Sequence, residues 1–197
     1  VEDLKEVKVQ VAPEAETVQV ESAFGGKRLY SEDGADIVWL RPLGVSVSRL
    51  TPYHGWDSFR ERTHKVWTKW RDVLGPRELA SVGLRYINRI DIPVSENDQI
   101  RIENFLRLTP NFPDQVFYHF ALQTQTPLGE FQLIVNTGSA PPALIGHVSY
   151  LLDLDLVKET DIPLREDDLW SMIAKMRDHK NQAFESYITD NTRNLFK

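Results

Sequence analysis

The chain has 197 residues, of which 41% are hydrophobic and 26% are charged. A chain of this length and composition can bury a hydrophobic core without covalent cross-links. It contains no cysteine, which excludes disulfide bonds, thiol catalysis and cysteine-ligated metal sites. The formal net charge of -6 argues against strong non-specific binding to a phosphate backbone, although a local basic patch remains open.

The sequence has no candidate membrane segment. No apolar run approaches the roughly 20 residues that span a bilayer, and no charged-then-apolar leader opens the chain. We therefore expect a cytoplasmic protein without a membrane partner. No linker divides the sequence, so the simplest organisation is a single domain over residues 1–197. Its parts are N-terminal strands in residues 1–50 and a helix-sheet-helix body in residues 51–197.

The first 50 residues alternate with a period of two, which predicts short β-strands. Valines recur at every second position in Val7–Val11 and in Val18–Val20. Gly25-Gly26 and Asp33-Gly34 are turn dipeptides, and Leu43-Gly44 is a further bend. Strands separated by such turns indicate a β-meander.

A helix follows Pro52, because the apolar period changes from two to that of an α-helix. Asp57 lies in the first turn, where the helix dipole favours a negative charge. Gly75-Pro76 supplies the residues expected just past the end. The positions that share one apolar face are Trp56, Phe59, Val66, Trp70 and Val73.

The second half of the chain predicts four strands and a second long helix. The first strand is Val82–Pro93, and the later segments are joined too briefly for helical crossovers, so the sheet is expected to be antiparallel. The acidic run Glu166–Asp168 opens a helix whose apolar positions extend to Ile188. The remaining strand candidates are Gln115–Thr126, Glu130–Thr137 and Ala143–Val157.

These elements predict an α+β fold, in which one antiparallel sheet carries two long helices on one face. After the N-terminal strands, the predicted elements follow along the chain in the order strand, helix, four strands, helix. This order is similar to the helix-grip and TATA-binding-protein-like architectures, a likeness of topology and not of function.

Three motifs resemble those of a sporadically distributed bacterial family of uncharacterised proteins. They are PYHGWxxF at Pro52–Phe59, GLRYINRI at Gly83–Ile90 and FESYIT at Phe184–Thr189. The resemblance extends from Arg28 to Phe196. It implies a patchy occurrence among bacteria and supplies no established activity.

The strand Val82–Pro93 carries two arginines on one side, since residues two apart in a strand share a face. Arg85, Ile87 and Arg89 lie opposite the apolar set that would face the core. Asp153 and Asp155 alternate in the same way on a later strand. The favoured interpretation is cross-strand ion pairing. The alternatives are an anion pocket, in which the arginines bind a phosphate or carboxylate, and a protein interface.

The tryptophans of the first helix are expected to pack in the core. Trp67 and Trp70 cannot both point straight at the core, so one of them is expected at a cavity rim or an interface. Aromatic residues could instead line a cavity for an apolar ligand between helices and sheet. The candidate ligand- or partner-binding residues are therefore Arg85, Arg89, Tyr53, Trp56, Trp67 and Tyr86.

No catalytic residue, metal ligand or cofactor is predicted. The five histidines show no paired metal-ligand spacing, and the sequence contains no nucleophile elbow, Walker loop or dinucleotide fingerprint. Basic residues along the first helix alternate with Asp57, Glu61 and Asp72, which indicates a solvated face and argues against nucleic-acid binding.

We therefore expect a non-enzymatic cytoplasmic binding or protein-interaction module. Its partner would be another protein, encoded by a neighbouring gene in a mobile bacterial locus such as a defence or toxin–antitoxin-like system. Two alternatives stay open. One is a binding protein for a small anionic or apolar ligand, with a cavity between sheet and helices. The other is an enzyme without a recognisable motif, which would show a perturbed titratable cluster in a cleft.

Overall fold

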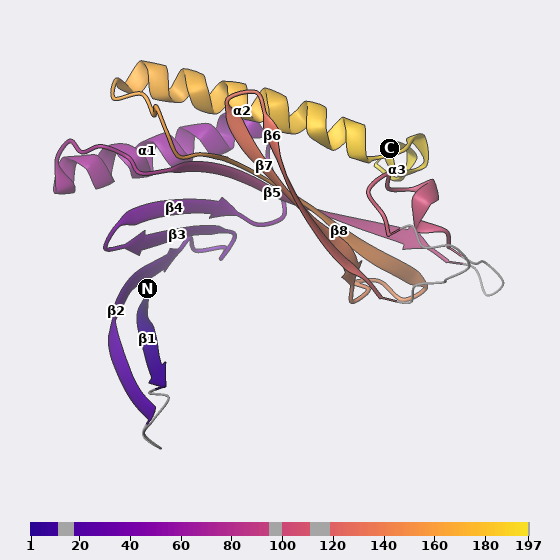
Figure 1. The fold of residues 1–197 in the computed structure, drawn as a ribbon, viewed down its shortest axis with the longest axis horizontal. Coiled ribbons are helices and arrows are strands. Elements are labelled where there is room, and N and C mark those ends of the chain that lie inside the picture. The colour runs from indigo at the N-terminus through magenta and orange to yellow at the C-terminus, as the bar shows by residue number, and fades with distance from the viewer. Residues whose placement is uncertain (12–17, 95–99, 111–118, 197) are drawn as a thin grey trace. The chain divides into compact units, whose positions relative to one another are not determined.

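The computed structural model describes residues 1–11, 18–94, 100–110 and 119–196 (Figure 1). The described residues form an α+β fold with two four-stranded antiparallel sheets, three α-helices and one short 3-10 helix. The chain divides into two compact units, Val1–Arg77 and Glu78–Lys197. The α+β class and the antiparallel pairing predicted from the sequence are confirmed.

The first unit contains a β-meander, as the alternation predicts. Each strand pairs with the next along the chain, in the order β1-β2-β3-β4. The predicted turn at Gly25-Gly26 is wrong, because both glycines lie inside a strand, at a register shift opposite Leu4 and Lys5. Glycine permits a bulge within a strand as readily as a turn, and the dipeptide does not distinguish the two. The strands are β1 (Glu2–Val11), β2 (Val18–Tyr30), β3 (Asp36–Arg41) and β4 (Gly44–Arg49).

Helix α1 (Trp56–Leu74) follows the meander and packs against β4. It ends at Gly75, whose φ of 76° is in the left-handed region that glycine adopts without strain. Arg62 in α1 donates a hydrogen bond of 2.8 Å to Asp36 of β3, so α1 covers the face of the meander that carries Asp36. The predicted helix and its end are confirmed.

The second unit contains the other sheet, in the order β5-β8-β7-β6. The predicted strand from Gln115 begins outside the described residues, and the described strand starts at Ala121. The strand that starts at Ala121 ends at Leu128, and a hairpin turn at Gly129 and Glu130 joins it to the next strand, which starts at Phe131. The strands are β5 (Val82–Pro93), β6 (Ala121–Leu128), β7 (Phe131–Ala140) and β8 (His147–Lys158).

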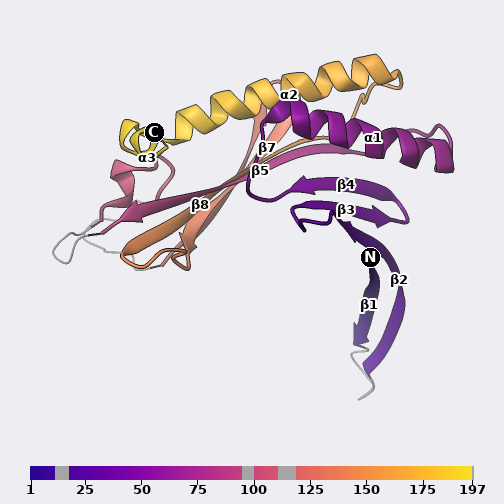
Figure 2. The ribbon, with the colours of Figure 1, turned by 180° about the vertical axis from the view of Figure 1, so that it is seen from behind.

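Helix α2 (Glu166–Tyr187) packs against β8 and β5, and both views show it lying along this sheet (Figures 1 and 2). The short helix α3 (Asp190–Leu195) packs against β5 of the same unit. The 3-10 helix Ile102–Asn104 precedes Leu106, which bridges to Ile188. The side chains that form the core of this unit include Leu84, Ile90, Ile92, Leu133, Val135, Leu152, Leu154, Leu156, Met172, Met176 and Ala183.

The single sheet predicted from the sequence is wrong, because the described strands form two sheets. Helix α1 belongs to the unit of the first sheet and α2 to the unit of the second. The placement of both long helices on one face of one sheet is not confirmed. Periodicity identifies the apolar face of each strand, but it does not specify which strands share hydrogen bonds.

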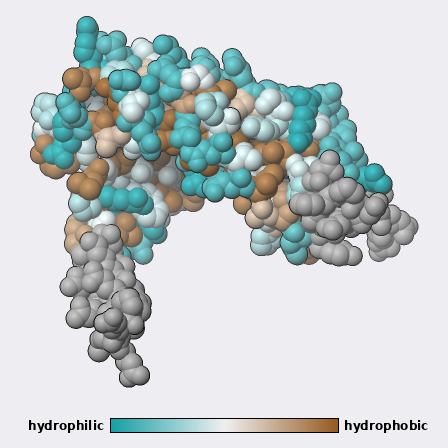
Figure 3. All heavy atoms as spheres, viewed as in Figure 1, coloured by the Kyte–Doolittle hydropathy of each residue, from teal (hydrophilic) through white to brown (hydrophobic). Residues whose placement is uncertain are grey.

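Hydrophobic and hydrophilic side chains are mixed on the face of the molecule that Figure 3 shows. The exposed large hydrophobic residues come from separate elements and include Leu43, Val73, Ile87 and Ile145. None of the helices in the described ranges has the length and apolar character that a membrane span requires.

Candidate functional site

The face of the second sheet that carries Arg85, Ile87 and Arg89 is here named the arginine face. These three residues are exposed on β5, whereas Leu84 and Ile90, on the opposite side of the strand, are buried. The alternation predicted from the sequence is therefore confirmed. Ile87, which lies between the two arginines, is 61% exposed.

A chain of hydrogen bonds crosses all four strands on the arginine face. Arg85 on β5 binds both carboxylate oxygens of Asp153 on β8, with its Nε at 2.8 Å and its Nη2 at 2.6 Å. Asn136 on β7 donates to Asp153 at 3.1 Å and accepts a hydrogen bond of 2.8 Å from Gln123 on β6. The carboxylate of Asp153, which is 8% exposed, is thus held in a fixed orientation.

The predicted cross-strand pairing of arginine and aspartate is confirmed for Arg85, with a diagonal geometry. The residue directly opposite Arg85 is Asp155, and Asp153 lies opposite Ile87. A long guanidinium side chain reaches the diagonal neighbour on the next strand, where it finds both oxygens in the geometry of its fork. This bidentate contact raises the pKa of Arg85 above its usual value.

Arg89 is bound in a different way, because its carboxylate partner lies on its own strand. Its Nε donates to Asp91 at 2.9 Å, and its Nη2 donates to Ser149 at 3.0 Å and to the backbone oxygen of Pro141. The hydroxyl of Ser149 also donates to Asp91, and this bond, with Arg89, lowers the pKa of Asp91. Arg89 does not pair with an aspartate of β8, so the predicted pairing does not extend to it.

Asp155 is the carboxylate of this face that receives no hydrogen bond from the described side chains. Its Oδ1 lies above Gly83, at 3.7 Å from the position a Cβ would take there. Partial burial raises the pKa of Asp155, the charge of Arg85 opposes the rise, and the charge of Asp153 adds to it. Asp155 is therefore a half-buried acid whose ionised form the fold disfavours.

We expect Asp155→Asn to stabilise the protein at neutral pH. Because the folded-state pKa lies above the unfolded value of about 3.8, ionisation costs stability as the pH rises through the folded pKa. The amide removes that cost, so the gain should disappear when the pH falls below about 4. Urea denaturation at pH 7 and at pH 3.5 measures the difference.

Asp91→Asn is the matched control, with the opposite expected sign. The pKa of Asp91 is lowered in the folded protein, so its contribution to stability is present above the unfolded pKa and is lost on acidification. The variant should be less stable than the parent at pH 7. A loss of stability at pH 7 in both variants would contradict the environment described for Asp155.

Tyr86 lies on the opposite side of β5 from the two arginines and faces α2. The ammonium group of Lys180, in α2, is 3.6 Å from the centre of the Tyr86 ring. Lys180 is only 7% exposed, and burial, with the charge of Arg177, lowers its pKa to about 8. The Tyr86 ring thus offers the ammonium group a cation–π contact, while burial disfavours its charged form. Lys180 is not among the residues predicted from the sequence, although its position four residues after Met176 places it on the apolar stripe of the helix.

The other candidate aromatic residues belong to the first unit. The ring of Phe59 lies 6.4 Å from that of Tyr53 and 6.3 Å from that of Trp56. Trp67 stacks on Trp70 with ring centres 5.4 Å apart. Trp70 is buried and Trp67 is half-buried, in agreement with the expectation that only one of them points at the core. The six predicted residues thus belong to two separate units: Tyr53, Trp56 and Trp67 to the first, and Arg85, Tyr86 and Arg89 to the second.

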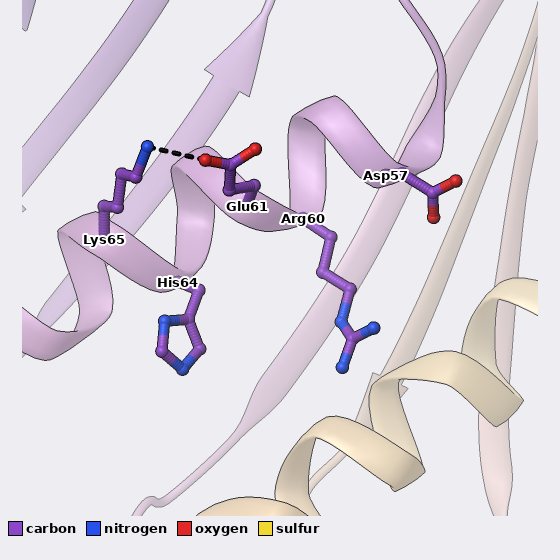
Figure 4. Close-up of a pocket in the computed structure, with 5 residues that line it drawn as sticks. All are labelled: Asp57, Arg60, Glu61, His64 and Lys65. Carbon is purple, nitrogen blue, oxygen red and sulfur yellow. Dashed lines mark hydrogen bonds and ion pairs between the residues drawn. The ribbon is translucent and has the colours of Figure 1, made fainter.

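A shallow pocket lies along α1, and its lining among the described residues comes from that helix (Figure 4). Lys65 and Glu61 form an ion pair of 2.6 Å, and the hydrogen bond from Lys65 is the main cause that lowers the pKa of Glu61. Opposite charges alternate along this surface, as the sequence predicts, so the pocket has no convergent charge for a ligand. The lining residues are Asp57, Arg60, Glu61, His64 and Lys65.

Within the described residues, no group of three or more histidine, aspartate or glutamate side chains is arranged to hold a metal ion. Comparison of the chain with protein-family models, with curated proteins and with solved structures returned no match. The geometry of the arginine face is therefore the main basis for a functional proposal.

Proposed function

We propose that the protein is a non-enzymatic binding module that recognises another protein through the arginine face. The observation that supports the proposal is Ile87, a large apolar side chain that is 61% exposed between two arginines with fixed partners. Apolar anchors surrounded by ordered polar groups are characteristic of the energetic centres of protein interfaces, where arginine is also enriched.

Binding of a small anion at Arg85 and Arg89 is less favoured by the same geometry. Both guanidinium groups already donate to carboxylates, at 2.6 and 2.9 Å. An anion would have to displace Asp153, which is buried and accepts a further hydrogen bond from Asn136. Leaving a buried carboxylate without its partner is costly, so a partner that leaves these pairs intact fits the face better.

The proposal includes the biological setting expected from the sequence. The chain would belong to the sporadically distributed bacterial family, act in the cytoplasm, and bind the product of a neighbouring gene in a defence or toxin–antitoxin-like locus. It also includes a helix-grip arrangement, with α1 and α2 across one sheet face. Distances between spin labels on exposed positions of the two helices would test that arrangement, and separations that vary widely would contradict it.

Ile87→Asp tests the proposed interface. The side chain is exposed, so the substitution should leave the melting temperature within a few degrees of the parent, while a charge at the centre of the face should abolish partner binding. The measurement is affinity capture from the native host with the tagged protein, quantified by mass spectrometry.

The matched control is Val73→Asp, which places the same charge at an apolar residue that is 83% exposed on α1. A protein captured by the parent and by Val73→Asp, but lost with Ile87→Asp, is the expected result. Equal capture by all three chains, or no protein captured above background, would contradict the proposal.

A further inference from the structure

The first sheet carries an aromatic and cationic cluster that is separate from the arginine face. Trp39 on β3 has Arg28 of β2 as its cross-strand neighbour, and the Cζ atom of Arg28 lies 3.7 Å from the centre of the Trp39 ring. Arg41, two residues further along β3, lies 5.2 Å from the same ring centre. Two guanidinium groups therefore surround one indole.

This cluster lies on the side of the meander that α1 does not cover. Asp36 and Arg49 face each other on β3 and β4, and the Asp36 carboxylate is bound by Arg62 of α1. Because side chains alternate along a strand, Trp39 and Arg41 point to the opposite side from Asp36. Helix α1 thus leaves the tryptophan side of the sheet uncovered within this unit.

Strand β4 leaves space beside Trp39. Its residues opposite Trp39 and Arg41 are Ser46 and Gly44. Ser46 is exposed, and a Cβ added at Gly44 would meet no atom within 4 Å. One side of the indole is therefore occupied by Arg28, and the other adjoins small residues.

The charge of the cluster favours an anionic ligand. Arg28 donates to Glu2 at 3.3 Å and to the hydroxyl of Tyr30 at 3.0 Å, so it is largely committed within the fold. Arg41 is exposed, and no carboxylate of the described residues forms an ion pair with it. The cluster around Trp39 contains the guanidinium groups of Arg28 and Arg41 and the carboxylate of Glu2. These three groups together carry one net positive charge.

We propose that this surface of β2, β3 and β4 binds single-stranded nucleic acid, with one base stacked on Trp39 over Ser46 and Gly44 and a neighbouring phosphate paired with Arg41. Sheets that bind single strands combine an exposed aromatic ring with cations that follow the backbone. The chain's net charge of -6 limits the number of phosphate contacts, so the binding is expected to be weak and local. This proposal does not depend on the protein-interaction function of the arginine face.

The test uses fluorescence anisotropy with the full chain and two fluorescein-labelled probes of about ten nucleotides, oligothymidylate and oligouridylate. We expect binding in roughly the micromolar range at low salt. Trp39→Ala should weaken binding at least about fivefold, through loss of base stacking. Trp39→Phe should restore much of this loss, because it keeps an aromatic face.

Arg41→Ala is the second variant, and it keeps the test informative if Trp39→Ala does not fold. It should reduce the slope of log Kd against log salt concentration by about 0.7, the contribution of one phosphate contact to a single strand. Lys69→Ala, at an exposed lysine on α1, removes the same charge elsewhere and should leave the affinity and the slope nearly unchanged.

The proposal is overturned by any of three results. They are binding of neither probe by the parent chain, equal weakening of binding by Lys69→Ala and Arg41→Ala, and competition by a heparin fragment that equals that of the unlabelled oligonucleotide. The last two results would indicate attraction of any polyanion, or of an acidic protein surface, without recognition of bases.

Discussion

Leu154→Ala is expected to lower the free energy of unfolding by about 3 kcal/mol. Leu154 is fully buried in β8, a central strand of the second sheet. Its cross-strand neighbours are Tyr86 on β5 and Val135 on β7, and α2 packs against the same strand. Truncation would leave a cavity that neighbours on both sides cannot close, because both belong to hydrogen-bonded strands.

Leu151→Ala is the control, because it makes the same truncation on the same strand but on the arginine face. Leu151 is only half-buried, and it lies opposite Arg89 and Gly138. Its loss should cost less than about 1 kcal/mol, since little apolar area is removed from a packed environment. Urea denaturation followed by circular dichroism measures both variants. Equal losses would contradict the assignment of α2 to the face that carries Leu154.

The faces of the second sheet could be predicted from the sequence because the period of a strand is two. In the segment from Leu151 to Leu156, the alternation places Leu152 and Leu154 in the core and Asp153 and Asp155 on the other side, as found. On β5, the same alternation places Arg85 on the opposite side from Leu84. The local sequence pattern therefore identifies the side chains that lie on the arginine face.

Strand register and sheet membership required the structure. The Arg85–Asp153 contact is diagonal, and a shift of one residue between β5 and β8 would have reversed the facing side chains. Asn136 and Gln123 complete the network, but nothing in the pattern of their strands marks either amide as part of a network with Asp153. The alternation of residues also does not indicate that strands β1 to β4 pair with one another in a separate sheet.

Lys180 illustrates a different limit of sequence interpretation. A lysine within an apolar helix stripe is ordinarily expected to extend its ammonium group to water. Here the partner is the ring of Tyr86, which lies on the covered side of β5, nearly 100 residues away in the sequence. Such a pairing depends on how α2 crosses the sheet, and the pattern of neither segment specifies that crossing.

Gly26→Ala is expected to destabilise the first sheet by about 3 kcal/mol or more. The φ of Gly26 is 123°, a conformation that residues with a side chain rarely adopt. A Cβ at this position would lie 2.1 Å from the backbone oxygen of Leu40 on the adjacent strand. Because the atom it meets belongs to the backbone, relief requires β2 and β3 to separate.

Gly44→Ala is the matched control in the same sheet. A Cβ at Gly44 would meet no atom within 4 Å. The substitution should leave the stability unchanged within about 0.5 kcal/mol, or raise it slightly through the lower entropy of the unfolded chain. Hydrogen exchange of the β2 and β3 amides measures the local effect of both variants.

The two glycines form a sharp test of the bulge, because both belong to dipeptides that the sequence presents as turns. Gly44 does follow the turn between β3 and β4, whereas Gly26 lies within β2. If Gly25-Gly26 were a turn, the methyl group of alanine would point to solvent, and the two substitutions would have similar small effects. Because Gly26 closely approaches Leu40, the amides of β2 and β3 should exchange faster in Gly26→Ala but not in Gly44→Ala.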